Sequence, residues 1–139
     1  MTLTAINAAA LCAVASDADV VAARQRGRKL AEQLGFGRAE QALIATAISE
    51  LARNIVNYAG SGTVEIGEVM RGRKQGLKVV ASDFGPGIKD VEMAMRDGFS
   101  TGNSLGLGLP GTRRLVDEFE ISSTPGTGVT VKFVKWKDR

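Results

Sequence analysis

Three polar side chains are spaced so that a helix would bring them together. Glu50, Asn54 and Asn57 span about 60° of a helix circumference at roughly 100° per residue. The apolar side chains of this stretch centre about 130° from Glu50 and are Ile44, Ile48, Leu51 and Ile55. A carboxylate at the rim of a core can accept a proton, and an asparagine amide oxygen can ligate Mg²⁺. An ordinary polar helix face would show the same pattern.

An aspartate follows an apolar strand candidate. Residues 77–82 predict a buried strand, and Asp83, Gly85 and Gly87 come directly after it. A carboxylate fixed at a strand end can accept a hydrogen bond from an exocyclic amine, and glycines let the backbone approach a flat ligand closely. A simple loop with a turn aspartate would account for these residues equally well.

Two further glycine motifs come later in the chain. Gly106 and Gly108 open a helix candidate, where free N–H groups and the positive end of the helix dipole attract phosphate. This motif is neither a dinucleotide-binding fingerprint after a strand nor a phosphate loop with a following Gly-Lys-Ser/Thr. Helix capping or close packing explains most such glycine pairs. Residues 125–128 (Pro-Gly-Thr-Gly) predict a hairpin turn.

These motifs must be positioned by a small set of regular elements. The patterns predict strands at 8–16, 62–69 and 77–82, helices from 16 or 17 to 34, at 38–59 and at 107–118, and a final hairpin that includes Ile121 and residues 129–136. A basic turn is expected at 72–76. The order β-α-α-β-β-loop-α-β-β indicates a layered α/β protein.

Composition limits the function classes. The 139 residues predict one domain, and 44% hydrophobic residues are typical of a globular protein. The net charge is +3, but only 5% of residues are aromatic, so we expect neither a nucleic-acid partner nor a membrane. The single cysteine, Cys12, fits a reducing, cytoplasmic compartment. The apolar run at residues 8–15 follows no Lys or Arg, so it predicts a strand and not a secretory signal.

The order and spacing of the motifs resemble the GHKL (Bergerat-fold) ATP-binding proteins over most of the chain. E-x-x-x-N, D-x-G-x-G-I, G-x-G and the last glycine turn correspond to the N, G1, G2 and G3 boxes. This resemblance implies an α+β two-layer sandwich, with a mixed β-sheet and helices packed on one face. Within that superfamily, the chain resembles the RsbT-type serine/threonine kinases at residues 21–25, 48–55, 97–101, 106–111, 114–119 and 135–136.

The resemblance also implies roles for residues. Glu50 would be the general base, Asn54 the Mg²⁺ ligand, and Asn57 a group that reaches metal or phosphate through water. Asp83 would bind the amino group of adenine. The other residues expected at the nucleotide are Gly85, Gly87, Ile88, Thr101, Ser104, Gly106, Leu107 and Gly108, the last three through backbone N–H groups.

Two further expectations concern the lid and the last strand. Residues 90–105 would form the ATP lid, with Gly98 or Gly102 as a hinge. The superfamily usually has Gly-Thr at the start of the last strand, with the threonine helping to hold adenine. Here Val129 follows Gly128, and Thr127 or Thr130 could replace that threonine only if the strand were shifted.

The resemblance implies an enzyme that uses ATP and Mg²⁺ to phosphorylate a serine or threonine of a STAS-domain regulatory protein (RsbS- or RsbR-like) in a stressosome-type stress response. The released kinase would then activate a PP2C-type phosphatase (RsbU-like). A SpoIIAB-type anti-sigma factor is the alternative from another class. A histidine-kinase catalytic domain would need a separate histidine-bearing chain, because this sequence has no histidine. A gyrase- or MutL-like ATPase is disfavoured, because the lid is short and no transducer domain follows.

Overall fold

The computed structural model describes residues 4–85, 108–124 and 126–138, with the side chains of residues 4–9 and 124 excepted. The elements in chain order are β1 (Thr4–Val14), α1 (Asp17–Gln33), α2 (Arg38–Tyr58), β2 (Gly62–Arg71), β3 (Lys74–Asp83), α4 (Gly108–Leu115), β4 (Glu118–Thr124) and β5 (Gly128–Trp136). No helix in these ranges combines the length and the hydropathy needed to cross a bilayer.

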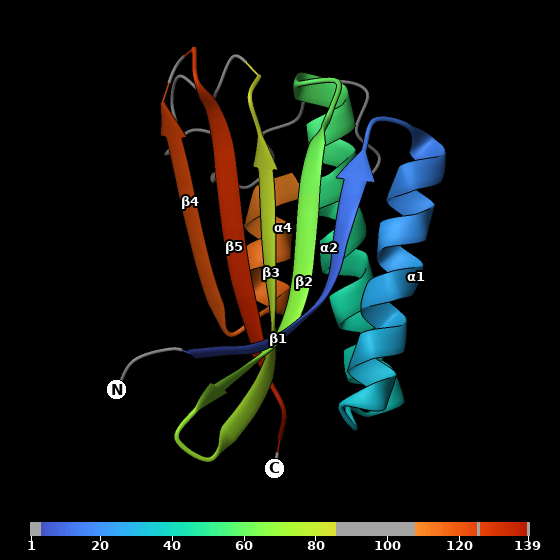
Figure 1. Cartoon of the computed structure of the whole chain (residues 1–139), viewed down its shortest axis with the longest axis vertical. Coiled ribbons are helices and arrows are strands. Elements are labelled where there is room, and N and C mark those ends of the chain that lie inside the picture. The colour runs from blue at the N-terminus through green and yellow to red at the C-terminus, as the bar shows by residue number, and fades with distance from the viewer. Residues whose placement is uncertain (1–3, 86–107, 125, 139) are drawn as a thin grey trace.

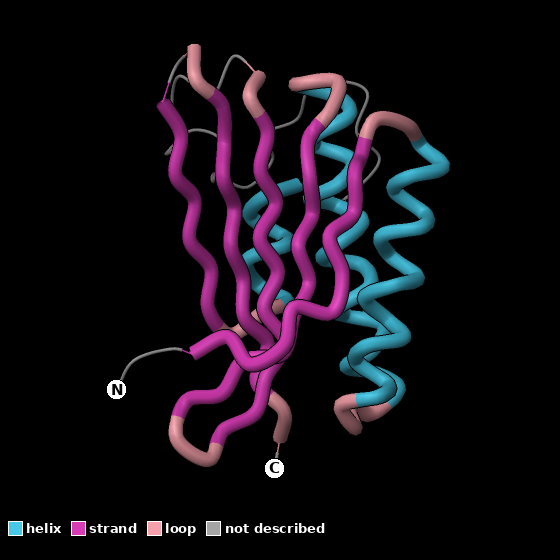
Figure 2. Tube along the Cα trace, viewed as in Figure 1, coloured by secondary structure: helices cyan, strands magenta, loops and turns pink. Residues whose placement is uncertain are grey.

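The elements form two layers. The strands make one sheet in the order β1-β2-β3-β5-β4, and the helices lie on one face of it (Figures 1 and 2). The two-layer sandwich is therefore confirmed. The expected mixed sheet is wrong for the described strands, because every pairing is antiparallel. Two of the four pairings, β2–β3 and β4–β5, are hairpins between consecutive strands, and the other two, β1–β2 and β3–β5, are also antiparallel although helices lie between their strands in the chain.

The two long helices begin and pack as their sequences predict. Ser16 caps α1, where its hydroxyl accepts the Asp19 N–H at 3.2 Å. Gly27 lets α1 approach α2, because a Cβ at this position would lie 2.0 Å from Ile48 Cδ1. The core between α1, α2 and the sheet is apolar, and its fully buried members include Ile44, Ile48, Leu51, Val64, Ile66, Leu77, Val79 and Phe133. Helix α2 therefore has one face fixed against the sheet.

Several boundaries differ from the sequence prediction. The first strand is shifted toward the N-terminus, to Thr4–Val14, because it follows β2 to the end of the β2–β3 hairpin. The expected basic turn at 72–76 is shorter, since Arg71 pairs with Lys74 across the hairpin. Helix α4 ends at Leu115 and not at 118, because β4 begins at Glu118.

A polar cluster joins β2, β3, β4 and β5 at the sheet end that also holds both chain ends (Figure 1). The Arg71 guanidinium donates to both Glu118 carboxylate oxygens, at 2.7 and 3.1 Å, and the Trp136 indole N–H donates to Glu118 at 2.7 Å. Arg71 and Lys74 also lie over the Trp136 ring, at 5.1 and 5.4 Å from its centre. The hydrogen bond from Arg71, followed by that from Trp136, lowers the pKa of Glu118.

Candidate active site

The described site residues on α2 and β3 lie toward the opposite end of the sheet from this cluster. Gly62, at the start of β2, pairs with Asp83 at the end of β3, and Ser82 pairs with Thr130 near the start of β5. The last turns of α2 lead into the same end of β2 (Figure 1). The helix motif and the strand-end aspartate therefore lie on neighbouring elements at one end of the molecule.

Glu50 is a buried charged residue, with 6% of its surface exposed. One carboxylate oxygen, Oε2, accepts a hydrogen bond from the Arg53 guanidinium one turn later on α2. The other, Oε1, accepts the backbone N–H of Gly108 at 3.2 Å. A buried carboxylate is costly unless it is paired, and these two donors supply that pairing. Glu50 is therefore not an ordinary residue of a solvated helix face.

Asn54 and Asn57 follow Glu50 along α2 with increasing exposure. Asn54 is half-buried and Asn57 is exposed. No described residue hydrogen-bonds to the side chain of Asn54, which lies about 6 Å further along the helix axis than Glu50. Its amide oxygen is therefore available for a ligand at the rim of the core.

Asp83 is half-buried and is held by backbone groups of two segments. Its Oδ1 atom accepts the N–H of Gly85 at 2.8 Å and the N–H of Val129 at 3.3 Å. Gly128 crosses close to it, since a Cβ there would lie 2.1 Å from the Asp83 carbonyl oxygen, and its φ of 117° also favours glycine. Within the described chain Oδ2 accepts no hydrogen bond, so one oxygen of a fixed carboxylate can bind a ligand amine.

The last strand is not shifted at Val129. Val129 pairs with Ser123, and Thr130 pairs with both Ser82 and Ser122, in a continuous register. Successive side chains of a strand point to opposite faces, so Thr130 cannot take the place of residue 129. Val129 packs instead against the main core. Its backbone N–H holds Asp83, but its side chain offers no hydroxyl at this position.

Gly108 begins α4, and its N–H is the one donated to Glu50. Thr112, which is fully buried, donates its hydroxyl to the Gly108 carbonyl at 2.9 Å. These contacts fix the start of α4 against α2. The other predicted residues of the phosphate and lid region lie outside the described residues, namely Gly87, Ile88, Thr101, Ser104, Gly106 and Leu107, together with the proposed hinges in 90–105.

Sequence reasoning missed two partners of the predicted site. The Glu50–Arg53 pair has the i, i+3 spacing of side chains that meet on a helix, so this spacing could have indicated it. The buried Thr112 carries no comparable signal, because its partner is a backbone carbonyl four residues earlier. Both residues support groups that were predicted to do chemistry.

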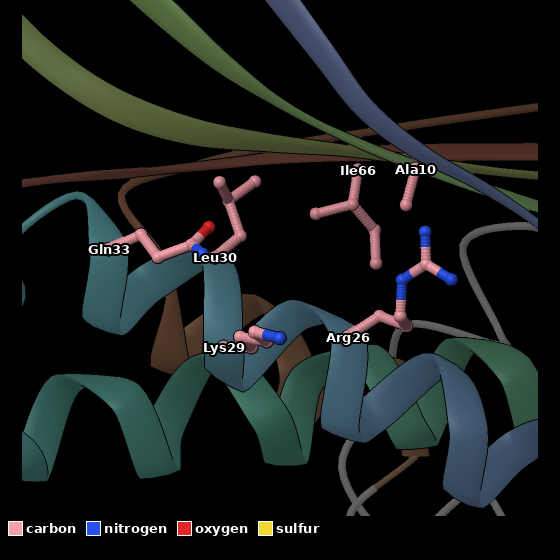
Figure 3. Close-up of a pocket in the computed structure, with 6 residues that line it drawn as sticks. All are labelled: Ala10, Arg26, Lys29, Leu30, Gln33 and Ile66. Atoms are coloured by element: carbon pink, nitrogen blue, oxygen red, sulfur yellow. The ribbon is translucent and has the colours of Figure 1, made fainter.

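A cavity of about 340 Å³ lies elsewhere, between α1 and the first two strands. Figure 3 shows its lining, with the Arg26 side chain extending from α1 toward Ala10 on β1, and with Lys29, Leu30, Gln33 and Ile66 completing the wall. None of the predicted site residues lines this cavity. We therefore do not assign the nucleotide to it.

The donor set can be tested for Mg²⁺. The described residues contain no cluster of three or more His, Cys, Asp or Glu side chains. A cation held entirely by such side chains is therefore not supported in this part of the chain. Mg²⁺ at nucleotides is instead held by one or two protein oxygens together with phosphates and water. The Asn54 amide, which pairs with nothing in the described part of the chain, fits that pattern.

Comparison with known proteins places the chain in a family. A family model described as "Histidine kinase-like ATPase domain" matches residues 13–135. The chain is 55% identical over 118 residues to the serine/threonine-protein kinase RsbT of Bacillus subtilis (strain 168), covering 85% of this chain and 89% of RsbT. The chain therefore belongs to the histidine kinase-like ATPase domain family.

Within that family, the resemblance to the RsbT-type serine/threonine kinases is confirmed, and with it the prediction of an ATP-using kinase. The anti-sigma F factor of Thermoanaerobacter sp. (strain X514) is 34% identical over 103 residues, which cover 70% of this chain and 71% of that protein. The RsbU and RsbW domains of Rv1364c from Mycobacterium tuberculosis share the fold, with a TM-score of 0.62 and 18% identity. The match covers 97% of this chain and about a third of that solved chain, 32%.

Proposed function

We propose that this kinase transfers the γ-phosphate of ATP to a serine or threonine of a STAS-domain regulatory protein in a partner switch of bacterial stress signalling. The observation that carries the proposal is the buried Glu50 carboxylate, held by two donors beside the start of α4. The 55% identity to RsbT supports the kinase class. A hydroxyl acceptor needs a base of this kind, because an alcohol is a weak nucleophile at neutral pH.

The chemical step follows from these residues. Glu50 accepts the proton of the substrate hydroxyl as the hydroxyl oxygen forms a bond to the γ-phosphorus. The bond between that phosphorus and the bridging oxygen of the β-phosphate breaks, and ADP leaves. Phosphoryl transfer depends mostly on positioning and charge neutralisation, so the rigid attachment of α2 to the sheet contributes by fixing Glu50.

Other residues would bind the nucleotide. Asp83 would accept a hydrogen bond from the adenine amino group at Oδ2, since Oδ1 already accepts hydrogen bonds from Gly85 and Val129. Asn54 would ligate Mg²⁺, which neutralises charge on the phosphate oxygens. Asn57 would act through water. The Gly108 N–H, which was expected to bind phosphate, is donated to Glu50 in this structure, so phosphate would be bound by the other N–H groups at the start of α4.

The direct test is phosphotransfer with purified proteins. ATP labelled at the γ-position is mixed with this chain and a candidate STAS-domain protein, and the label on each protein is measured. We expect label on the STAS protein with wild-type kinase and about 10²–10⁴-fold slower transfer with Glu50→Gln. Equal transfer by the two kinases would show that Glu50 is not the base.

The proposed partner switch includes a PP2C-type phosphatase that the free kinase activates. We expect the STAS protein and the phosphatase to compete for the kinase. We also expect phosphorylation of the STAS protein to release the kinase from it. Phosphatase activity is measured with the kinase alone, with the STAS protein added, and then with ATP. A phosphatase that responds to none of these additions would remove this part of the proposal.

An anti-sigma factor is the second candidate, and it is favoured by the anti-sigma F relatives at 34–35% identity. Such a protein would bind a sigma factor in a nucleotide-dependent manner. Binding of the chain to sigma factors, measured with ATP and with ADP, distinguishes the two functions. Tight ATP-dependent capture of a sigma factor, without transfer to a STAS protein, would favour the anti-sigma reading.

A further inference from the structure

Arg53 is placed beside the candidate base in an unusual electrostatic setting. Its side chain is 39% exposed, whereas the Glu50 side chain with which it pairs is 7% exposed. An ion pair between two exposed side chains one turn apart on a helix contributes little. Here one charge is buried, so removal of Arg53 would leave a desolvated carboxylate with a single described donor.

The two donors hold different oxygens of the carboxylate. Arg53 donates to Oε2, from the same helix, and Gly108 donates to Oε1, from the start of α4. Two attachment points on separate atoms restrict rotation of the carboxylate about its terminal bond. Gly108 is itself held through Thr112, so the second point does not depend on Arg53. The orientation of Oε2, however, depends on the guanidinium.

The exposure of Arg53 places the guanidinium at the solvent rim of the site. A protein hydroxyl must approach from solvent, and of the two donors to Glu50 it is Arg53, with a side chain 39% exposed, that holds Oε2, whereas Gly108 holds Oε1 from the start of α4. A guanidinium carries five N–H donors, and one of its nitrogens is engaged with Glu50. The pair can therefore remain intact while substrate is bound.

We propose that Arg53 is a positioning residue for phosphotransfer, which holds the Glu50 carboxylate in the orientation that accepts the proton of the substrate hydroxyl. The inference rests on the proposed function, because it needs a hydroxyl acceptor and a base. This positioning role differs from a structural role in one respect. Arg53 would change the rate of transfer through Glu50 and leave nucleotide binding nearly unchanged.

A double-mutant cycle tests this assignment. Transfer to the STAS protein is measured for wild type, Arg53→Met, Glu50→Gln and the double variant, together with ATP affinity by calorimetry and the unfolding temperature. We expect Arg53→Met to lower kcat about 10–100-fold and to change the KM for ATP less than threefold. In the Glu50→Gln background the same change should lower kcat less than twofold, because no carboxylate remains to be oriented.

Two further variants serve as controls. Arg53→Lys keeps a cation at the site and should recover part of the lost kcat. Arg38→Met makes the same change at an exposed arginine at the start of α2, and should leave kcat and KM near wild type.

The outcomes separate the possible failures. Full additivity in the cycle would overturn the inference, since Arg53 would then act on the phosphate or on the fold and not through Glu50. Wild-type kcat in Arg53→Met would also overturn it, while the proposed function stood. If the wild-type kinase transfers no label, the proposed function fails, and the inference falls with it because no base remains to be positioned.

Discussion

Asp83 uses only one of its two carboxylate oxygens within the described chain, and this asymmetry defines what the residue can recognise. Oδ1 is held by the N–H groups of Gly85 and Val129, so the orientation of the carboxylate is fixed by the protein itself. Oδ2 is left to accept a hydrogen bond from an exocyclic amine. Guanine has a carbonyl where adenine has its amine, so in the proposed role this oxygen would favour adenine.

Asp83→Asn should therefore weaken ATP binding and reduce the preference for ATP over GTP. The proposed site needs both carboxylate oxygens as acceptors, one for the backbone N–H groups and one for adenine. An asparagine amide has only one oxygen, so in either orientation its NH₂ group replaces one acceptor. The expected loss of binding free energy is roughly 1–3 kcal/mol. Calorimetric titration with ATP and GTP measures it, and Asp138→Asn, an exposed aspartate near the end of the chain, is the control. Unchanged affinity and selectivity would count against adenine recognition by Asp83.

A second prediction concerns the metal-binding role proposed for Asn54. Replacing it by alanine should abolish most of the Mg²⁺ dependence of ATP binding, together with phosphotransfer, because the octahedral shell loses one protein oxygen and can replace it only with water. ATP is titrated with and without Mg²⁺, with Asn57→Ala for comparison, since that exposed residue is expected to act only through water. A normal Mg²⁺ response in Asn54→Ala would show that the residue does not ligate the metal.

At the scale of elements, the structure agrees with the sequence prediction where local patterns determine the secondary structure. The apolar periodicity of α2 predicts both its extent and the side on which Glu50 lies, and the glycine turn predicts the last hairpin. The structure differs from the prediction where contacts with residues distant in the sequence determine where an element begins. Residues 116–118 continue a helical pattern, yet β4 begins at Glu118, which pairs with Arg71 from a hairpin 47 residues earlier.

The candidate site shows the same division. The alignment of Glu50 with Asn54 is a helix property and can be predicted from spacing alone. The contact between Glu50 and Gly108 joins residues 58 positions apart, so only the folded arrangement of α2 and α4 reveals it. The all-antiparallel pairing of the described strands could likewise not be predicted from local patterns, because it depends on the order of the strands in the sheet.

The cluster that joins the β2–β3 hairpin to β4 and β5 predicts a pH effect on stability. The pKa of Glu118 is lowered in the folded protein, mainly by Arg71, so its contribution is present above the ordinary glutamate pKa and is lost as pH falls through the folded value. Glu118→Gln should cost at most about 1 kcal/mol at pH 7, because the side chain is more than a third exposed at 37%.

Urea unfolding of the wild type and Glu118→Gln at a series of pH values checks this expectation. The difference in unfolding free energy between them should shrink as the solution becomes more acidic than the ordinary glutamate pKa. Glu120→Gln is the control, since its side chain is 73% exposed and its pair with Lys132 is long, at 3.9 Å. A difference that stays constant with pH would mean that the carboxylate charge of Glu118 does not stabilise the fold.

For the whole molecule, the chemical stability of the phosphorylated product distinguishes the kinase classes. The chain has no histidine, so it cannot form phosphohistidine on itself. We expect the purified chain to stay unlabelled with γ-labelled ATP, and the label on the STAS protein to survive acid, as phosphoserine and phosphothreonine do. Acid-labile, base-stable label on a histidine of the partner would favour a histidine-kinase reaction instead.

The start of β1 and the end of β5 lie at the end of the sheet opposite Asp83, since Thr4 pairs with Met70 and Trp136 with Gly76, whereas Asp83 pairs with Gly62. A tether continuing from either of these strand ends would therefore leave the candidate site at Asp83 uncovered. The kinase could be immobilised on a sensor surface through a terminal tag and still meet its partners from solution. This orientation would allow the proposed exchange between a STAS-domain protein and a phosphatase to be tested on one captured sample, with ATP as the trigger.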